Sequence, residues 1–72
     1  MTMQVATICF PDRDSGDDAV VVVRTAGEVA GLALSLRKNG DIEVFFGAQE
    51  LDQLIEALER TRSLLSDRKS PV

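Results

Sequence analysis

The sequence lacks the residue types on which most catalysis near neutral pH depends. It contains no histidine, no tyrosine and no tryptophan, and Cys9 is its only cysteine. Without histidine the usual general base is absent, and a thiol without an activating neighbour is a poor nucleophile. No serine stands in a recognisable catalytic motif. We therefore expect a protein that is not an enzyme and that needs no cofactor.

A single cysteine also excludes a disulfide within the chain, and long apolar runs are absent as well. Free cysteines are usually small core residues, and Cys9 stands in an apolar run, so we expect it to be buried. A chain without a disulfide framework fits a reducing compartment. No stretch approaches the roughly 20 apolar residues that span a bilayer, and no basic segment of the signal-peptide type precedes the first apolar run. The sequence predicts a cytoplasmic protein that does not bind membranes.

Positive charge is in short supply, and the charges are unevenly placed. Eight lysines and arginines stand against twelve aspartates and glutamates, which gives a net charge of −4. This opposes nonspecific binding to nucleic acid, which depends on counterions released by basic side chains. The acidic and basic clusters are Asp12, Asp14, Asp17 and Asp18, and Arg60, Arg62, Arg68 and Lys69. We expect an acidic end and a basic end on one small domain.

The aspartate cluster resembles a calcium-binding loop in composition but not in spacing. The EF-hand pattern has a glycine at position six and a bidentate glutamate at position twelve. Counted from Asp12, Gly16 comes one residue early and Val23 takes the twelfth position. We therefore predict a solvated hairpin loop and no metal site, with a weak cation site as the alternative.

The chain of 72 residues has room for one domain. A domain of this size buries only about 60% of the surface that its unfolded chain exposes, so a monomer would be marginally stable. We assign residues 1–66 to a single domain and expect residues 67–72 to form a flexible tail.

Runs of β-forming residues, separated by turn residues, predict four strands followed by a helix. The expected strands cover about 3–10, 19–24, 29–37 and 41–46, and the helix covers about 48–66. Apolar residues recur at helical spacing in the last segment: Leu51, Leu54, Ile55, Leu58 and Leu65. Gly47 is expected to cap that helix, with Glu50 three positions on. Because short connections favour neighbouring strands, the predicted fold class is α+β, a four-stranded antiparallel β-meander with one C-terminal helix packed on one sheet face.

The turn between the last two strands determines their register. A three-residue loop with Gly40 in a left-handed conformation places all the leucines on one face. It pairs Leu36 with Ile42, Leu34 with Val44, Leu32 with Phe46, and Arg37 with Asp41. A two-residue Asn-Gly turn, the usual structure of this dipeptide, would put charges and leucines on the same face. We therefore predict the three-residue loop.

One helix covers one face of the sheet, and the face with Leu32, Leu34 and Phe46 is the natural choice. The opposite face would then expose Phe45 and two of the four consecutive valines. A contiguous apolar patch of this kind usually marks an interface. We predict a homodimer with Val20, Val22 and Phe45 at its self-association face. The alternative is a monomer that tolerates scattered exposed apolar residues.

The expected order of elements resembles the single-strand-binding domain of the transcriptional coactivator PC4 family and its bacterial relatives. The resemblance rests on four antiparallel strands followed by one helix, covers most of the chain and carries no specific motif. It implies a dimer that binds single strands across a curved sheet. Arg24, Arg37 and Lys38 would contact phosphates, and Phe45 would stack on a base. The net negative charge and the scarcity of aromatic residues depart from that pattern.

The sequence therefore favours a small non-enzymatic protein–protein interaction module, homodimeric and of the regulator, immunity or inhibitor type. Its expected contacts with a protein partner are Asp12, Asp14, Asp17, Asp18, Val20, Val22 and Phe45. The aspartates would offer charge complementarity to a basic partner, which chiefly sets encounter rate and specificity. The alternative function is single-stranded nucleic-acid binding.

Overall fold

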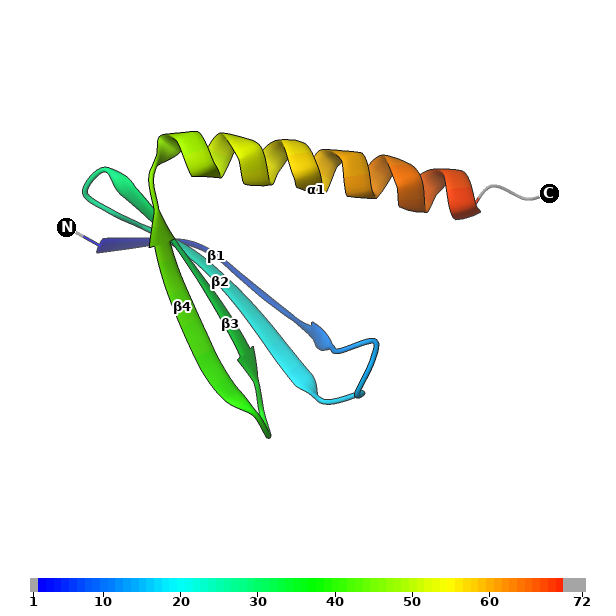
Figure 1. Ribbon diagram of the computed structural model, residues 1–72. Coiled ribbons are helices and arrows are strands. Elements are labelled where there is room, and N and C mark those ends of the chain that lie inside the picture. Colours follow the sequence, from blue (N-terminus) through cyan, green and yellow to red (C-terminus); the bar gives the residue numbers. More distant parts are fainter. Residues whose placement is uncertain (1, 70–72) are drawn as a thin grey trace.

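The computed structural model describes residues 2–69 and shows one sheet of four strands followed by one helix (Figure 1). The elements are β1 (Thr2–Pro11), β2 (Asp18–Ala26), β3 (Val29–Leu36), β4 (Gly40–Phe46) and α1 (Ala48–Lys69). The strands pair antiparallel in the order β1-β2-β3-β4. The predicted α+β meander with a C-terminal helix packed on the sheet is confirmed.

The turn between β2 and β3 is the tightest in the chain. Ala26 pairs with Val29, so only Gly27 and Glu28 connect the strands. Gly27 has a φ of 64°, and no described residue other than glycine has a positive φ. Positive φ at the first central residue alone is the signature of a type II′ turn, whose twist matches that of antiparallel strands.

The register between β3 and β4 differs by two residues from the prediction. Leu34 pairs with Ile42 and Leu32 with Val44, while Leu36 already pairs with Gly40. Gly40 does have a positive φ, 79°, as predicted. The predicted pairs were wrong because alternation fixes only which residues share a face, and a shift of two leaves every face unchanged.

Arg37 is the residue most affected by this shift. It does not face Asp41, because Ser35 occupies that position. Arg37 leaves the sheet instead, and its Nη1 lies 3.3 Å from Asp18 Oδ2 at the start of β2. Both side chains are largely exposed, so this ion pair contributes little to stability.

A bulge interrupts the pairing of β1 with β2. Gln4 pairs with Arg24 and Ala6 with Val23, which leaves Val5 unpaired. From Ala6 onward the pairing is regular, and Phe10 faces Ala19. Since a bulge bends its strand, this edge of the sheet differs in shape from the regular edge formed by β4.

The helix begins as predicted and ends later. The Gly47 backbone N donates to Glu50 Oε1 at 2.9 Å, and the Leu51 backbone N donates to Gly47 O at 3.0 Å. Glu50 thus satisfies a backbone donor at the helix start. The helix continues to Lys69 because residues 67–69 include no proline or glycine. The helix thus includes residues 67–69 of the expected tail, and residues 70–72 lie outside the described residues.

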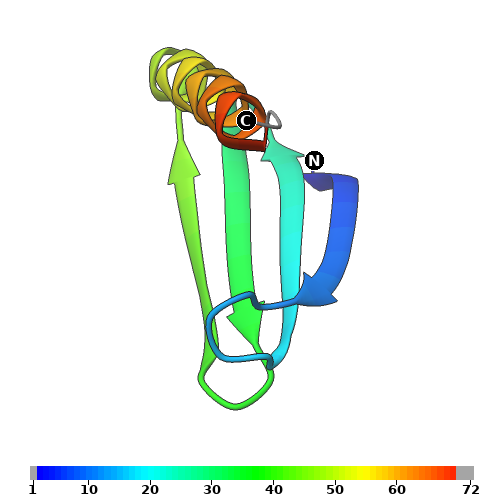
Figure 2. The same ribbon diagram turned by 90° about the vertical axis from the view of Figure 1, so that its right-hand side faces the viewer.

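The helix covers only one end of the sheet. It leaves the end of β4, contacts β3 and then extends beyond the sheet, so that the gap between them widens toward its C-terminal end (Figures 1 and 2). Leu51, Leu54 and Ala57 are half-buried at the closed end of this gap. The chain therefore forms two layers that meet at one end and are open at the other.

Candidate self-association surface

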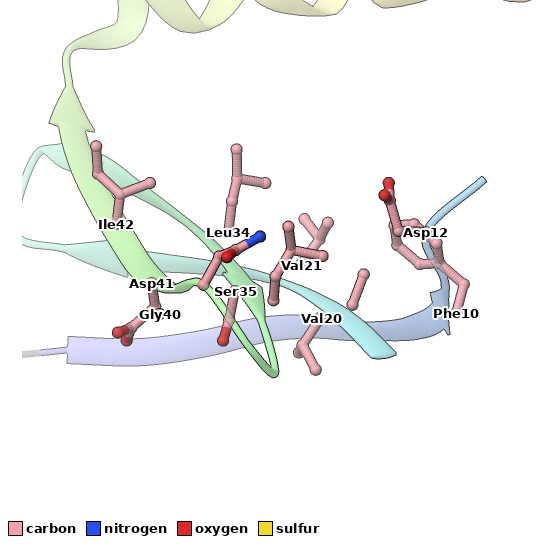
Figure 3. A pocket seen from close by; sticks show the side chains of 12 residues that line it. Phe10, Asp12, Val20, Val21, Leu34, Ser35, Gly40, Asp41 and Ile42 are labelled. Carbon is pink, nitrogen blue, oxygen red and sulfur yellow. The ribbon is translucent and has the colours of Figure 1, made fainter. Parts of the chain in front are cut away.

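The sheet face toward the helix is almost entirely apolar. Strand pairing assigns to this helix-side face Met3, Ala6, Ile8, Phe10, Ala19, Val21, Val23, Thr25, Ala30, Leu32, Leu34, Leu36, Ile42, Val44 and Phe46. None of these residues is charged. Figure 3 shows Leu34, Val21 and Ile42 on the side of the helix, and Val20, Ser35 and Asp41 on the opposite side.

Several large apolar residues of the helix-side face are open to solvent, which contradicts the expectation that the helix covers this face. Ile42 is 63% exposed, Val44 53% and Leu34 48%. Ala19, at 7%, is the only side chain among residues 2–66 that the structure buries. The expectation was wrong because a helix covers a face only when its axis follows that face, and α1 departs from it.

The exposed residues of this face were missing from the predicted interface. The sequence placed Leu34, Ile42 and Val44 beneath the helix and therefore in the core. The widths of a sheet and of a helix could have indicated that this face stays partly uncovered. Four strands about 4.8 Å apart form a face about 19 Å wide, whereas a helix is about 10 Å across. One helix cannot cover such a face even when it lies flat on it.

The part of α1 from Leu58 onward exposes further leucines. Leu58 is 59% exposed, Leu65 53% and Leu64 62%. They follow the half-buried Leu51 and Leu54 along the same helix. The exposed helical surface thus begins where contact with the sheet ends.

The size of the molecule shows how much surface remains uncovered. The accessible surface is 6072 Å², whereas a compact monomer of this mass exposes about 4,400 Å². The radius of gyration is 14.5 Å, against about 11 Å for a compact domain of this length. The chain alone therefore buries far less surface than a folded monomer does.

A shallow depression of about 380 Å³ lies at the hairpin end of the helix-side face (Figure 3). Its lining includes Phe10, Val21, Leu34 and Ile42, with Asp12 among the few polar residues at its margin. The depression offers apolar contact and no convergent set of polar groups, so it suits side chains better than a polar small molecule.

The opposite face of the sheet, the far face, is more polar. It carries Val20 and Val22, both half-buried, and Cys9, which is exposed. Cys9 was expected in the core, but it is exposed because β1 is an edge strand and nearly all of its residues are exposed on both faces. Phe45 is also on this face and is 50% exposed. The predicted roles of Val20, Val22 and Phe45 in self-association stay predictions.

Phe45 and Arg24 pack on the far face around Gly31. A Cβ added at Gly31 would lie 2.7 Å from Phe45 Cε2 and 3.0 Å from Arg24 Cγ. Arg24 Nε lies 3.2 Å from Glu43 Oε2 as an ion pair, although its geometry does not satisfy a hydrogen bond. Glycine is thus required at this position by the close approach of side chains to the backbone.

The basic residues of the nucleic-acid alternative do not converge. Arg24 is ion-paired to Glu43 in the middle of the far face, while Arg37 is ion-paired to Asp18 near the β3–β4 turn. Lys38 lies in that turn, and its backbone N donates to Asp17 Oδ2 at 2.8 Å. Both arginines would have to exchange a carboxylate for a phosphate, so no basic stripe is ready for a nucleic-acid backbone.

The aspartate-rich loop is held by its own hydrogen bonds. Asp12 Oδ2 accepts from the Ser15 hydroxyl at 2.7 Å and from the Ser15 backbone N at 2.9 Å. These bonds from Ser15 hold the pKa of Asp12 below its ordinary value of 3.8. Asp17 and Asp18 bind the Lys38 amide and the Arg37 side chain respectively. Their role as contacts for a basic partner, like that of Asp14, stays a prediction.

Two further classes of site find no support in the described part of the chain. Within residues 2–69, no group of three or more histidine, cysteine, aspartate or glutamate side chains could hold a metal ion. Over the same range, no helix has both the length and the apolar character needed to cross a membrane.

Comparison with known proteins leaves the surface to be interpreted on its own chemistry. No family model, no curated protein and no solved structure matches this chain.

Proposed function

We propose that the protein is a small non-enzymatic protein–protein interaction module, of the regulator, immunity or inhibitor type, that works as a homodimer. The observation that carries this proposal is the exposed helix-side face, with Ile42 63% exposed and no charged residue among its strand positions. Exposed apolar surfaces of this extent mark interaction sites in soluble proteins.

The amount of uncovered surface supports a second copy as the occupant. The chain exposes about 1,700 Å² more than a compact monomer of its mass. A standard protein–protein interface buries about 800 Å² on each partner, and obligate homodimers bury more. An obligate dimer therefore accounts for the excess, and it supplies a core, which is lacking where Ala19 is the one buried side chain among residues 2–66.

The test is the oligomeric state of the full chain and of two matched variants. Sedimentation velocity with interference optics suits this protein because it has neither tyrosine nor tryptophan. The wild type should sediment as a dimer. Leu34→Lys places a charge on the helix-side face and should dissociate it, with loss of structure detected by circular dichroism.

Ser35→Lys is the matched control. It introduces the same side chain at the next residue of β3, on the far face and opposite Asp41, so the dimer should persist. A wild type that is folded and monomeric at its highest soluble concentration contradicts the proposal. Equal dissociation by both variants would also contradict it, because the effect would then not depend on the face.

A further inference from the structure

We propose, on the basis of the proposed homodimer, that each protomer inserts the part of α1 from Leu58 onward into the open gap of its partner. Leu58 and Leu65 of one copy would pack on the part of the helix-side face formed by Leu34, Ile42 and Val44 of the other. The dimer would thus be an exchange of helices, and not a contact between two outer sheet faces.

Both surfaces needed for this exchange are exposed on one chain. At the closed end of the gap, Leu51 and Leu54 are half-buried against the sheet. At its open end, Leu58 and Leu65 on the helix are more than half exposed, as are Ile42 and Val44 on the sheet. Because the two exposed surfaces face the same gap, a two-fold axis makes one self-complementary contact out of both.

The width of the sheet requires a second helix. A helix about 10 Å across covers about two strands that lie about 4.8 Å apart. The sheet has four strands, and the chain has one helix. A partner's helix beside the chain's own would cover the remaining two strands, whereas closure of the chain's own helix would leave half of the face bare.

Charge complementarity gives the inserted helix a direction. The far end of the sheet, beside the depression, carries the loop with Asp12, Asp17 and Asp18. The later part of α1 carries Arg62, and also Arg60, whose Nη1 lies 3.1 Å from Glu56 Oε1 on the same helix. A partner helix that enters with its C-terminal end toward this loop brings opposite charges together, which favours the productive encounter.

Cross-linking between two distinguishable chains tests this arrangement. Both chains carry Cys9→Ser, and one of them carries an affinity tag. One chain then carries Ile42→Cys and the other carries Leu65→Cys. After the two are unfolded, mixed and refolded, a short bismaleimide should yield a product with the summed mass of both chains. Leu34→Cys with Leu58→Cys is a second pair, in case the first does not refold by circular dichroism.

The control replaces the sheet cysteine with Ser35→Cys on the far face, which should abolish the heterotypic product. If cross-links form only between two copies that both carry Ile42→Cys, the helix exchange is wrong, but the proposed homodimer is still supported. A chain with both Ile42→Cys and Leu65→Cys that cross-links only within itself also overturns it, because the helix then closes on its own sheet. A monomeric chain without any cross-link overturns the proposed function as well.

Discussion

Phe45 lies directly across the β3–β4 pairing from Gly31, and its ring covers the backbone of that glycine. A glycine inside a strand offers no side chain to pack and weakens the strand. An aromatic cross-strand neighbour that covers it recovers part of the lost contact. The pair therefore acts as a unit, in which the ring requires the absence of a Cβ.

Gly31→Ala should destabilise the fold by about 1–3 kcal/mol, the usual cost of added volume at a packed position. The added Cβ would lie 2.7 Å from Phe45 Cε2, so the ring must move. Urea denaturation at fixed protein concentration measures the loss. In the double variant with Phe45→Ala, the alanine at 31 should cost less than it does alone; equal costs would show that the two residues do not interact.

Glu50→Ala should destabilise the start of α1 by about 0.5–1.5 kcal/mol, the net value of one hydrogen bond. The variant removes the acceptor of the Gly47 amide, which now donates to Glu50 Oε1 at 2.9 Å. Glu50→Gln keeps an acceptor at the same position and should retain most of the stability. Thermal unfolding followed at 222 nm compares the three proteins, and a glutamine variant as unstable as the alanine variant would argue against the bond.

Acid should remove the stabilisation that Asp12 provides in its loop. Its folded-state pKa is lowered from 3.8 by the bonds from Ser15, so the ionised form is favoured in the folded state. That contribution is complete above pH 3.8 and is lost as pH falls through the lowered value. The stability difference between wild type and Asp12→Asn should therefore shrink below pH 3.8. Ser15→Ala should behave like Asp12→Asn, and a difference that stays constant with pH would contradict the assignment.

Thermal stability should depend on protein concentration, because unfolding of an obligate dimer releases two chains. Each tenfold dilution should lower the free energy of unfolding by about 1.4 kcal/mol per dimer. Circular dichroism melts over a wide concentration range measure this shift. A midpoint that does not change with concentration would mean that the separated chain holds its own fold.

The protein should not bind single-stranded DNA or RNA in a salt-sensitive manner. The arginines named for phosphate contact are paired with Glu43 and Asp18, and the chain is net negative. Fluorescence anisotropy of labelled oligonucleotides at low salt provides the measurement. Binding that weakens steeply with salt, and that Arg24→Ala removes, would instead support the single-strand-binding alternative.

The order of elements could be predicted from the sequence because strand and helix periods are local properties. The alternation in β3 and β4 also assigned each residue to the correct face. Alternation has a period of two, however, and so it could not distinguish the predicted pair Leu36–Ile42 from the observed pair Leu34–Ile42. That choice depended on which three residues form the turn, 37–39 as observed or 38–40 as predicted, and Gly40 fits a left-handed conformation in either case.

The sequence predicted that an apolar interface exists, but not the sheet face on which the exposed residues lie. An excess of apolar residues over what one helix covers was visible in the sequence, and it indicated an interface. The angle at which α1 leaves the sheet is set by the connection at Gly47 and by packing on β3, and no local pattern encodes it. The sequence therefore placed the exposed residues on the far face, at Val20, Val22 and Phe45, whereas Leu34 and Ile42 are exposed on the face beside the helix.

The two edges of the sheet are guarded against fibrous aggregation by different means. The β1 edge is bent by the bulge at Val5 and ends in Pro11, which has no amide hydrogen to offer an added strand. The β4 edge is regular, and the repulsion between Asp41 and Glu43 of neighbouring copies is what opposes stacking there. Concentrated salt screens repulsion but leaves a bend unchanged. Concentrated salt would therefore permit pairing through β4 alone, and such pairing stops at two copies because the β1 edge offers no second site for growth.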